Sequence, residues 1–193
     1  MNERMEEALL RIAHSLERLA PPTVDDADPA AGEGGRWALR WDGARLHDVA
    51  QAHVVPLDRF AGVDPQIAAL RQNIGALARG APSHDMLLWG ARGMGKSALV
   101  RTVARAEGVT LVQAAGDQLG TLPALFARLE SAARPFVLFV DDLAFTAADP
   151  EVRTLRSLLD GGIAERPHNV RLAVTSNHRH LIERPPADSR HAR

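Results

Sequence analysis

The sequence predicts an α/β fold in which the strands of a parallel sheet alternate with helices. Apolar runs at 86–89, 109–114, 136–140 and 169–175 predict buried strands, and segments with helical periodicity separate them. A glycine-rich loop follows the first run, and two adjacent carboxylates follow the third. Because ligands of open α/β folds bind beyond the carboxyl ends of the strands, we expect the functional site at that edge of the sheet.

A phosphate-binding loop joins the first predicted strand to the helix after it. Residues 90–97 read Gly-Ala-Arg-Gly-Met-Gly-Lys-Ser, which is the pattern of a P-loop. Glycines let backbone N–H groups approach phosphate oxygens, and the helix start adds partial positive charge. The ammonium of Lys96 would reach the β- and γ-phosphates, and the hydroxyl of Ser97 would coordinate Mg²⁺. The predicted phosphate-binding residues are Gly90, Ala91, Arg92, Gly93, Met94, Gly95, Lys96, Ser97 and Ala98.

The use of lysine supports this assignment. Lys96 is the one lysine of the chain, and the other 22 of its 23 Lys and Arg residues are arginines. A compact ammonium fits where a planar guanidinium would not. A glycine-rich turn with an incidental lysine is the alternative, and the full P-loop pattern disfavours it.

Length and composition exclude several other classes of protein. A chain of 193 residues can bury one substantial core, and its net charge of −1 gives no overall basic field for nucleic acid. The absence of cysteine excludes disulfides, cysteine-ligated zinc and thiol catalysis. We find no signal peptide or membrane span in the sequence and expect a cytoplasmic location.

The N-terminal third divides into three predicted parts. Residues 1–20 predict an amphipathic helix, which either packs on the domain or contacts a second copy or a protein partner. Residues 21–35 predict a flexible acidic linker. Residues 36–50 predict a β-hairpin around Asp42-Gly43, with Trp37, Leu39 and Trp41 on one face. That face either packs against the protein or stacks on nucleic-acid bases.

The nucleotide-binding core is expected at 51–182. Its first helix begins at Pro65, and a later helical period covers 119–132. A further helix is expected at 150–160, and residues 183–193 are expected to be a disordered tail.

Two carboxylates end the strand predicted at 136–140. Asp141 would hold Mg²⁺ as a hard oxygen ligand, and Asp142 would orient or deprotonate the attacking water. An acidic turn without catalytic function is the alternative. Asn177 follows the next strand, where its amide would lie near the same edge, and a helix or turn cap is its alternative to a role in the site. His178 and His180 lack an obvious third ligand, so we expect no zinc site.

Four runs together resemble a family of bacterial AAA+ ATP-binding proteins catalogued as being of unknown function. They are residues 87–97, 139–143, 161–167 and 175–181, and the resemblance covers about 37–182. The resemblance implies a three-layer α/β/α P-loop NTPase of the AAA+ (ASCE) type with ATP as its nucleotide. It also implies that Asn177 is sensor 1 and that Gly62 and Val63 line the adenine pocket, unless they form an ordinary surface turn.

The sequence departs from this family after Leu181. A full AAA+ module continues into a fifth strand, an arginine-finger segment and a helical lid. We expect this chain to be a C-terminally shortened copy without them, with strands in the order 2-3-4-1. Arg166 and Arg179 are candidates for a finger supplied in trans, although a surface or salt-bridge role is the favoured alternative for each.

The sequence therefore predicts Mg²⁺-dependent hydrolysis of ATP to ADP and phosphate. The predicted catalytic residues are Lys96, Asp141, Asp142 and Asn177, with Ser97 and Asp141 at the metal. Two alternatives stay open. One is a nucleotide-dependent binding module with little hydrolysis, and the other is a DNA-associated AAA+ helper or loader.

Overall fold

The computed structural model describes residues 37–49, 52–143, 145–146, 166–177 and 182–183. Several predictions concern residues outside these ranges. They are the amphipathic helix, the acidic linker, the helix at 150–160, the tail beyond 183, Arg179, His178 and His180.

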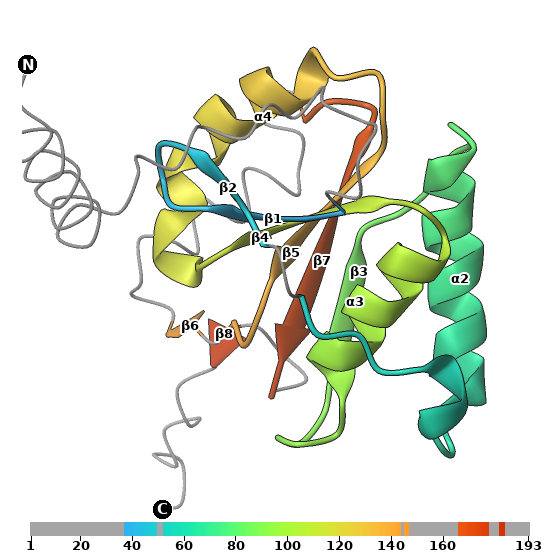
Figure 1. The fold of residues 1–193 in the computed structure, drawn as a ribbon. Helices are drawn as coiled ribbons and strands as arrows, with labels where there is room; N and C mark the ends of the chain where they lie inside the picture. The colour runs from blue at the N-terminus through green and yellow to red at the C-terminus, as the bar shows by residue number, and fades with distance from the viewer. Residues whose placement is uncertain (1–36, 50–51, 144, 147–165, 178–181, 184–193) are drawn as a thin grey trace, which may run out of the picture.

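Four parallel strands form most of the sheet (Figure 1). They are β3 (Met86–Trp89), β4 (Thr110–Ala114), β5 (Phe136–Val140) and β7 (Val170–Ser176). Their spatial order is β4-β5-β7-β3, with every neighbouring pair parallel. This order confirms the predicted 2-3-4-1 arrangement. In the described part of the chain, β3 lies at the edge of the sheet.

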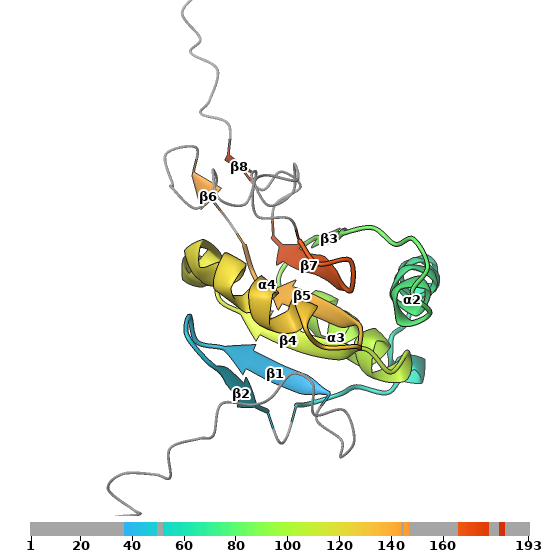
Figure 2. The ribbon, with the colours of Figure 1, turned by 90° about the horizontal axis from the view of Figure 1, so that it is seen from above.

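Helices cover both faces of this sheet, so the predicted three-layer α/β/α fold is confirmed (Figures 1 and 2). On one face lie α2 (Asp64–Ala78) and α3 (Lys96–Ala106). On the other lie the short 3-10 helix η2 (Gly116–Thr121) and α4 (Leu122–Glu130). Pro65 stands in the first turn of α2, where its missing N–H costs no hydrogen bond.

Alternating side chains of the central strands form two separate hydrophobic cores. In β5, Val137 and Phe139 pack with α2 and α3, whereas Phe136, Leu138 and Val140 pack with α4. All five side chains are fully buried. Burial of both faces is typical of the central strands of parallel sheets and explains the uninterrupted apolar run.

The predicted hairpin forms around Asp42 and Gly43. Strand β1 (Ala38–Trp41) pairs antiparallel with β2 (Leu46–Asp48). Gly43 has φ +101°, a left-handed value that glycine adopts easily. The Asp42 carboxylate accepts hydrogen bonds from the backbone N–H groups of Ala44 and Arg45. A hydrogen bond with His47, together with these two, lowers the pKa of the Asp42 carboxyl below its usual range.

The hairpin is also part of the main sheet, because β1 pairs in parallel with β4. Leu39 and Trp41 pack in the core beneath α4, and Trp41 Nε1 donates to Thr121 Oγ1 at 2.8 Å. Trp37 precedes the strand and packs against the other core, so the prediction of one shared face is wrong for this residue. Arg105 lies over the Trp37 ring and Trp41 is 1% exposed, so the hairpin offers no open tryptophan face for base stacking.

Two short features were not predicted. Strands β6 (Phe145–Thr146) and β8 (Ile182–Glu183) form a separate parallel pair, and a 3-10 helix, η1, spans Leu57–Arg59. Among the described helices, none is both long enough and apolar enough to cross a membrane.

Trp41→Ala should destabilise the whole domain, because it removes a fully buried side chain and its hydrogen bond to Thr121. We expect the free energy of unfolding to fall by about 3–5 kcal/mol, measured by urea denaturation. Arg40→Ala is the control, since this residue of the same strand is exposed and should change stability by no more than about 0.5 kcal/mol. Equal effects of the two variants would show that the hairpin is not part of the cooperative core.

Candidate nucleotide-binding site

The carboxyl ends of β3, β5 and β7 meet at a polar cavity of about 360 Å³. Its lining includes residues 92–98, both predicted aspartates and Asn177. Arg101 and Thr175 also line it, although the sequence analysis did not single them out. Gly90 and Ala91 line an adjoining cavity together with Val63. The structure therefore brings the predicted catalytic residues and residues 92–98 to one cavity, and Gly90, Ala91 and Val63 to the adjoining one.

Left-handed backbone conformations shape the loop between β3 and α3. Gly90, Gly93 and Gly95 have φ values of +150°, +79° and +79°, which side chains with a Cβ rarely adopt. Gly95 is also the N-cap of α3, and a Cβ there would lie 3.4 Å from Phe60 Cε1. The loop conformation thus requires the glycines of the predicted pattern.

The Lys96 ammonium is held by three acceptors. It donates to the carbonyl oxygens of Gly90 at 2.7 Å and Ala91 at 2.9 Å, and to Asn177 Oδ1 at 3.1 Å. An ammonium has three donors, so any further acceptor must replace one of these or share its proton. The longest bond, to Asn177, is the first candidate for exchange.

Asp141 joins strand β5 to the first turn of α3. Its Oδ1 accepts from Ser97 Oγ and from Thr175 Oγ1, both at 2.5 Å. No other described group donates to this carboxylate. The hydroxyl of Ser97 and the carboxylate of Asp141 thus form an adjacent pair of hard oxygen ligands, which is the chemistry that Mg²⁺ selects.

Asp142 has an unusual backbone. Its φ of +54° is the one left-handed value of a residue other than glycine in the described ranges. Aspartate tolerates this conformation better than most residues, and such outliers cluster at functional sites. Its N–H donates to Thr175 Oγ1 at 2.9 Å. Arg92 Nη2 donates to Oδ2 at 3.0 Å, and Asn177 Nδ2 donates to Oδ1.

The Asn177 side chain bridges Lys96 and Asp142. Its Oδ1 accepts from Lys96 and its Nδ2 donates to Asp142. Replacing either contact would shift the amide and thus affect the other. Both of these contacts are with side chains, and residues 178–181, which a cap at Asn177 would serve, lie outside the described ranges.

Thr175 is a residue of the site that the sequence analysis did not single out. Its side chain is 1% exposed, and its hydroxyl donates to Asp141 while accepting from the N–H of Asp142. Threonine is common in strands, so its type alone gives no warning. Its position was the signal that could have identified it. Thr175 is a polar residue near the end of an apolar run, and the neighbouring strand β5 is followed by two carboxylates.

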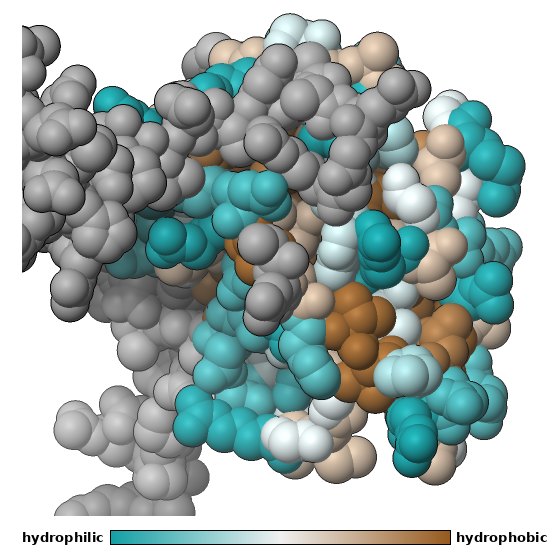
Figure 3. All heavy atoms as spheres, in the orientation of Figure 1, coloured by the Kyte–Doolittle hydropathy of each residue, from teal (hydrophilic) through white to brown (hydrophobic). Residues whose placement is uncertain are grey.

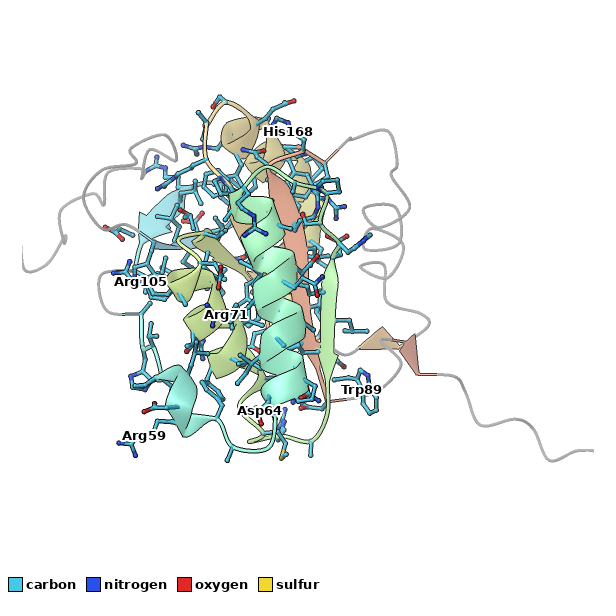
Figure 4. The ribbon with its side chains drawn as sticks, turned by 90° about the vertical axis from the view of Figure 1, so that its right-hand side faces the viewer. Arg59, Asp64, Arg71, Trp89, Arg105 and His168 are labelled. Carbon is cyan, nitrogen blue, oxygen red and sulfur yellow. The ribbon has the colours of Figure 1, made fainter. Side chains whose placement is uncertain are left out.

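The adjoining cavity is larger and more apolar. Its volume is about 480 Å³, and its lining combines P-loop residues with apolar side chains of Phe60, Val63, Leu87, Trp89 and Met94. Figure 4 labels Trp89 on β3, beside the α2 helix. Gly62 is not part of the lining, so of the two predicted adenine-pocket residues only Val63 reaches this cavity.

The segment before α2 is fixed in place by a buried threonine. Thr102 of α3 donates to the carbonyl oxygen of Val55 at 2.8 Å and accepts from its N–H at 3.2 Å. Hydrophobic atoms gather where this segment crosses α3 (Figure 3). This attachment positions Phe60 and Val63 beside the P-loop.

Arg166, a candidate finger, lies at the other end of the sheet. It donates to the carboxylate of Asp85, which directly precedes β3. The structure therefore favours the salt-bridge alternative for Arg166. Among the described residues, there is no cluster of three or more His, Asp or Glu side chains that could hold a metal ion.

Residues 35–193 match a protein-family model described as "Protein of unknown function (DUF815)". This chain belongs to the DUF815 family. The P-loop, the strand order and this membership establish an AAA+ type of P-loop core for nucleotide binding, as the resemblance implied.

Solved structures similar to this DUF815 chain include a lysine-to-arginine mutant of RuvB from Thermotoga maritima. The two are 24% identical, with a TM-score of 0.49 over 66% of this chain and 43% of the RuvB chain. This chain thus spans less than half the length of that structure. No curated protein matches it.

Thr175→Val should destabilise the site while keeping the shape of the side chain. The substitution removes one donor to Asp141 and leaves the N–H of Asp142 without its acceptor. We expect a loss of about 1–3 kcal/mol in the free energy of unfolding, measured by urea denaturation. Thr175→Ser restores the hydroxyl and should recover most of it. A fully stable Thr175→Val variant would contradict the structural role of this hydroxyl.

Proposed function

We propose that this protein binds ATP with Mg²⁺ at the 360 Å³ cavity and hydrolyses it to ADP and phosphate. The observation that carries the proposal is the hydrogen bond between Ser97 and Asp141. It joins the first turn of the P-loop helix to the carboxyl end of the central strand. A hydroxyl and a carboxylate in contact at that point are the protein ligands of the metal in P-loop NTPases.

The cradle for the phosphates is built mainly from backbone. Three glycines hold the loop around the start of α3, whose first N–H groups lack acceptors within the helix. Phosphate oxygens would accept from these groups and from Lys96, in exchange for the long bond to Asn177. Arg92 and Arg101 add positive charge at the same cavity.

The two oxygen ligands also suit the metal. Mg²⁺ keeps several waters and takes one or two protein ligands together with substrate phosphates. Ser97 and Asp141 supply such a set, and a cluster of three or more carboxylates is not required. When bound, the ion would neutralise phosphate charge as a Lewis acid.

Asp142 and Asn177 would promote the attack of water. In this step the water oxygen forms a bond to the terminal phosphorus, and the bond from phosphorus to the bridging oxygen breaks. ADP leaves with the electron pair of that bond, and Asp142 accepts the proton of the water. The amide of Asn177, which already contacts Asp142, would hold the water in line.

The adjoining apolar cavity would accommodate the base. Phe60, Val63 and Trp89 offer apolar contacts, and the cavity shares Gly90, Ala91 and Lys96 with the phosphate-binding loop. A ligand with an aromatic ring at one end and phosphates at the other fits this pair of cavities. The proposal of Val63 as an adenine contact rests on this adjacency.

A binding module with little hydrolysis is the second candidate, and one observation favours it. Both carboxylate oxygens of Asp142 are already engaged, one by Arg92 and one by Asn177. The Arg92 contact is exposed and contributes little stability, so a ligand could displace it. If it persists with ATP bound, Asp142 would be a weak base. A partner or second copy at the predicted N-terminal helix remains part of this proposal.

Lys96→Ala and Asp142→Asn separate binding from hydrolysis. Removing the ammonium should weaken MgATP binding by about 2–5 kcal/mol, or at least about 30-fold, measured by calorimetry. Asp142→Asn should bind ATP as well as the parent and hydrolyse it about 10²–10⁴-fold more slowly.

The controls decide between the two candidates. Arg40→Ala, on an exposed part of β1, should leave binding and hydrolysis unchanged. A parent that binds ATP but turns over no faster than Lys96→Ala would favour the binding module. Equal ATP affinity of Lys96→Ala and the parent would contradict both.

Val63→Trp should test the base cavity. A larger side chain there would fill part of the cavity and should weaken ATP binding about tenfold, through a loss of about 1.4 kcal/mol of apolar contact. Its affinity for inorganic triphosphate, which has no base, should not change. Ala124→Trp on the exposed side of α4 is the control. An equal loss for both ligands would show that Val63 supports the phosphate loop instead.

A further inference from the structure

Arg101 is a charged residue of the 360 Å³ cavity that pairs with no described residue. It lies one helical turn after Ser97 on α3 and lines the same cavity as the P-loop and the two aspartates. In the described part of the chain, its guanidinium forms no hydrogen bond and no ion pair. Its Nε is buried and unpaired, although the side chain as a whole is only half-buried. A guanidinium that lines the cavity and has no acceptor among the described residues suits an anionic ligand.

The other two cations of the cavity already have partners. Lys96 donates to two carbonyls and to Asn177, and Arg92 pairs with Asp142. The neighbouring carboxylates are also engaged, Asp141 by two hydroxyls and Asp142 by Arg92 and Asn177. Arg101 is thus the cation of the described site that is still available to a ligand.

Its position on the helix indicates which part of the ligand it would meet. Residues i and i+4 of a helix lie on the same face, with Cβ atoms about 5–6 Å apart. Ser97 is a proposed metal ligand, so Arg101, four residues later on α3, lies beside the proposed metal position. Asp141 lines the same cavity and contacts Ser97. This is the end of the cavity where the terminal phosphoryl group would lie, whereas the base cavity does not include Arg101.

We propose that Arg101 binds the terminal phosphoryl group of the nucleotide from within the same chain. This inference rests on the proposed function and deepens it, because it makes the site selective for a triphosphate over a diphosphate. A planar guanidinium suits two phosphate oxygens at once. Arg101 would thereby supply in cis the charge that an arginine finger provides in other P-loop enzymes.

Calorimetry with MgATP and MgADP tests this role without relying on turnover. Arg101→Ala should lower ATP affinity about tenfold or more and leave ADP affinity within about twofold of the parent. Arg101→Lys should retain part of the preference. Arg101→Gln keeps most of the length of the side chain without its charge, and should show the same selective loss of ATP affinity. It serves as the test if Arg101→Ala folds poorly.

Arg105→Ala is the matched control. This arginine lies one turn further along the same face of α3, but its guanidinium stacks 5.3 Å from the centroid of Trp37, outside the cavity (Figure 4). The Arg105→Ala variant should bind both nucleotides with the affinities of the parent protein.

Two results would overturn the inference and leave ATP binding by the site intact. One is an unchanged ratio of ATP to ADP affinity in Arg101→Ala and Arg101→Gln. The other is an equal loss for both nucleotides, which would indicate a structural role. A parent protein that binds neither nucleotide would instead refute the proposed function itself.

Discussion

The register of three parallel strands is the constraint on which the site depends. Val140 of β5 pairs with Val174, and Trp89 of β3 pairs with Ser176, so the loops that follow both strands meet at the end of β7. Backbone hydrogen bonds fasten both loops there, from Gly90 N to Ser176 O at 3.2 Å and from Leu143 N to Thr175 O at 2.8 Å. A shift by one residue would turn Thr175 to the opposite face and separate the acidic turn from the P-loop.

Two adjoining cavities give the site a polar half and an apolar half. Carboxylates, hydroxyls and cations line the first, and aromatic and aliphatic side chains line the second. The P-loop separates them and contributes to both. Such a division suits a ligand with a charged tail and a flat apolar ring. Helix α3 contributes Ser97 and Arg101 to the polar cavity, and the segment before α2 contributes Phe60 and Val63 to the apolar one.

Local sequence patterns predicted the parts of the molecule that local physics decides. The glycine positions, the buried strands and the aspartates at the end of β5 follow from residue type and spacing. Contacts between distant segments were not predictable in this way. The pairing of β1 with β4 joins residues more than 70 positions apart, such as Ala38 and Leu111, and no local pattern marks it. Thr175 resembled an ordinary strand residue, and Arg101 an ordinary exposed helix residue, until the fold placed both in one cavity.

Amide hydrogen exchange of the parent protein, with and without ATP and Mg²⁺, tests the central claim most directly. If the backbone of residues 90–98 cradles phosphates, its exchange should slow when the nucleotide is added, together with that of residues 141–143 and 175–177. The face beneath α4 should change less. Unchanged exchange across the P-loop at millimolar ATP and Mg²⁺ would contradict the account, because the cradle would then hold no phosphate.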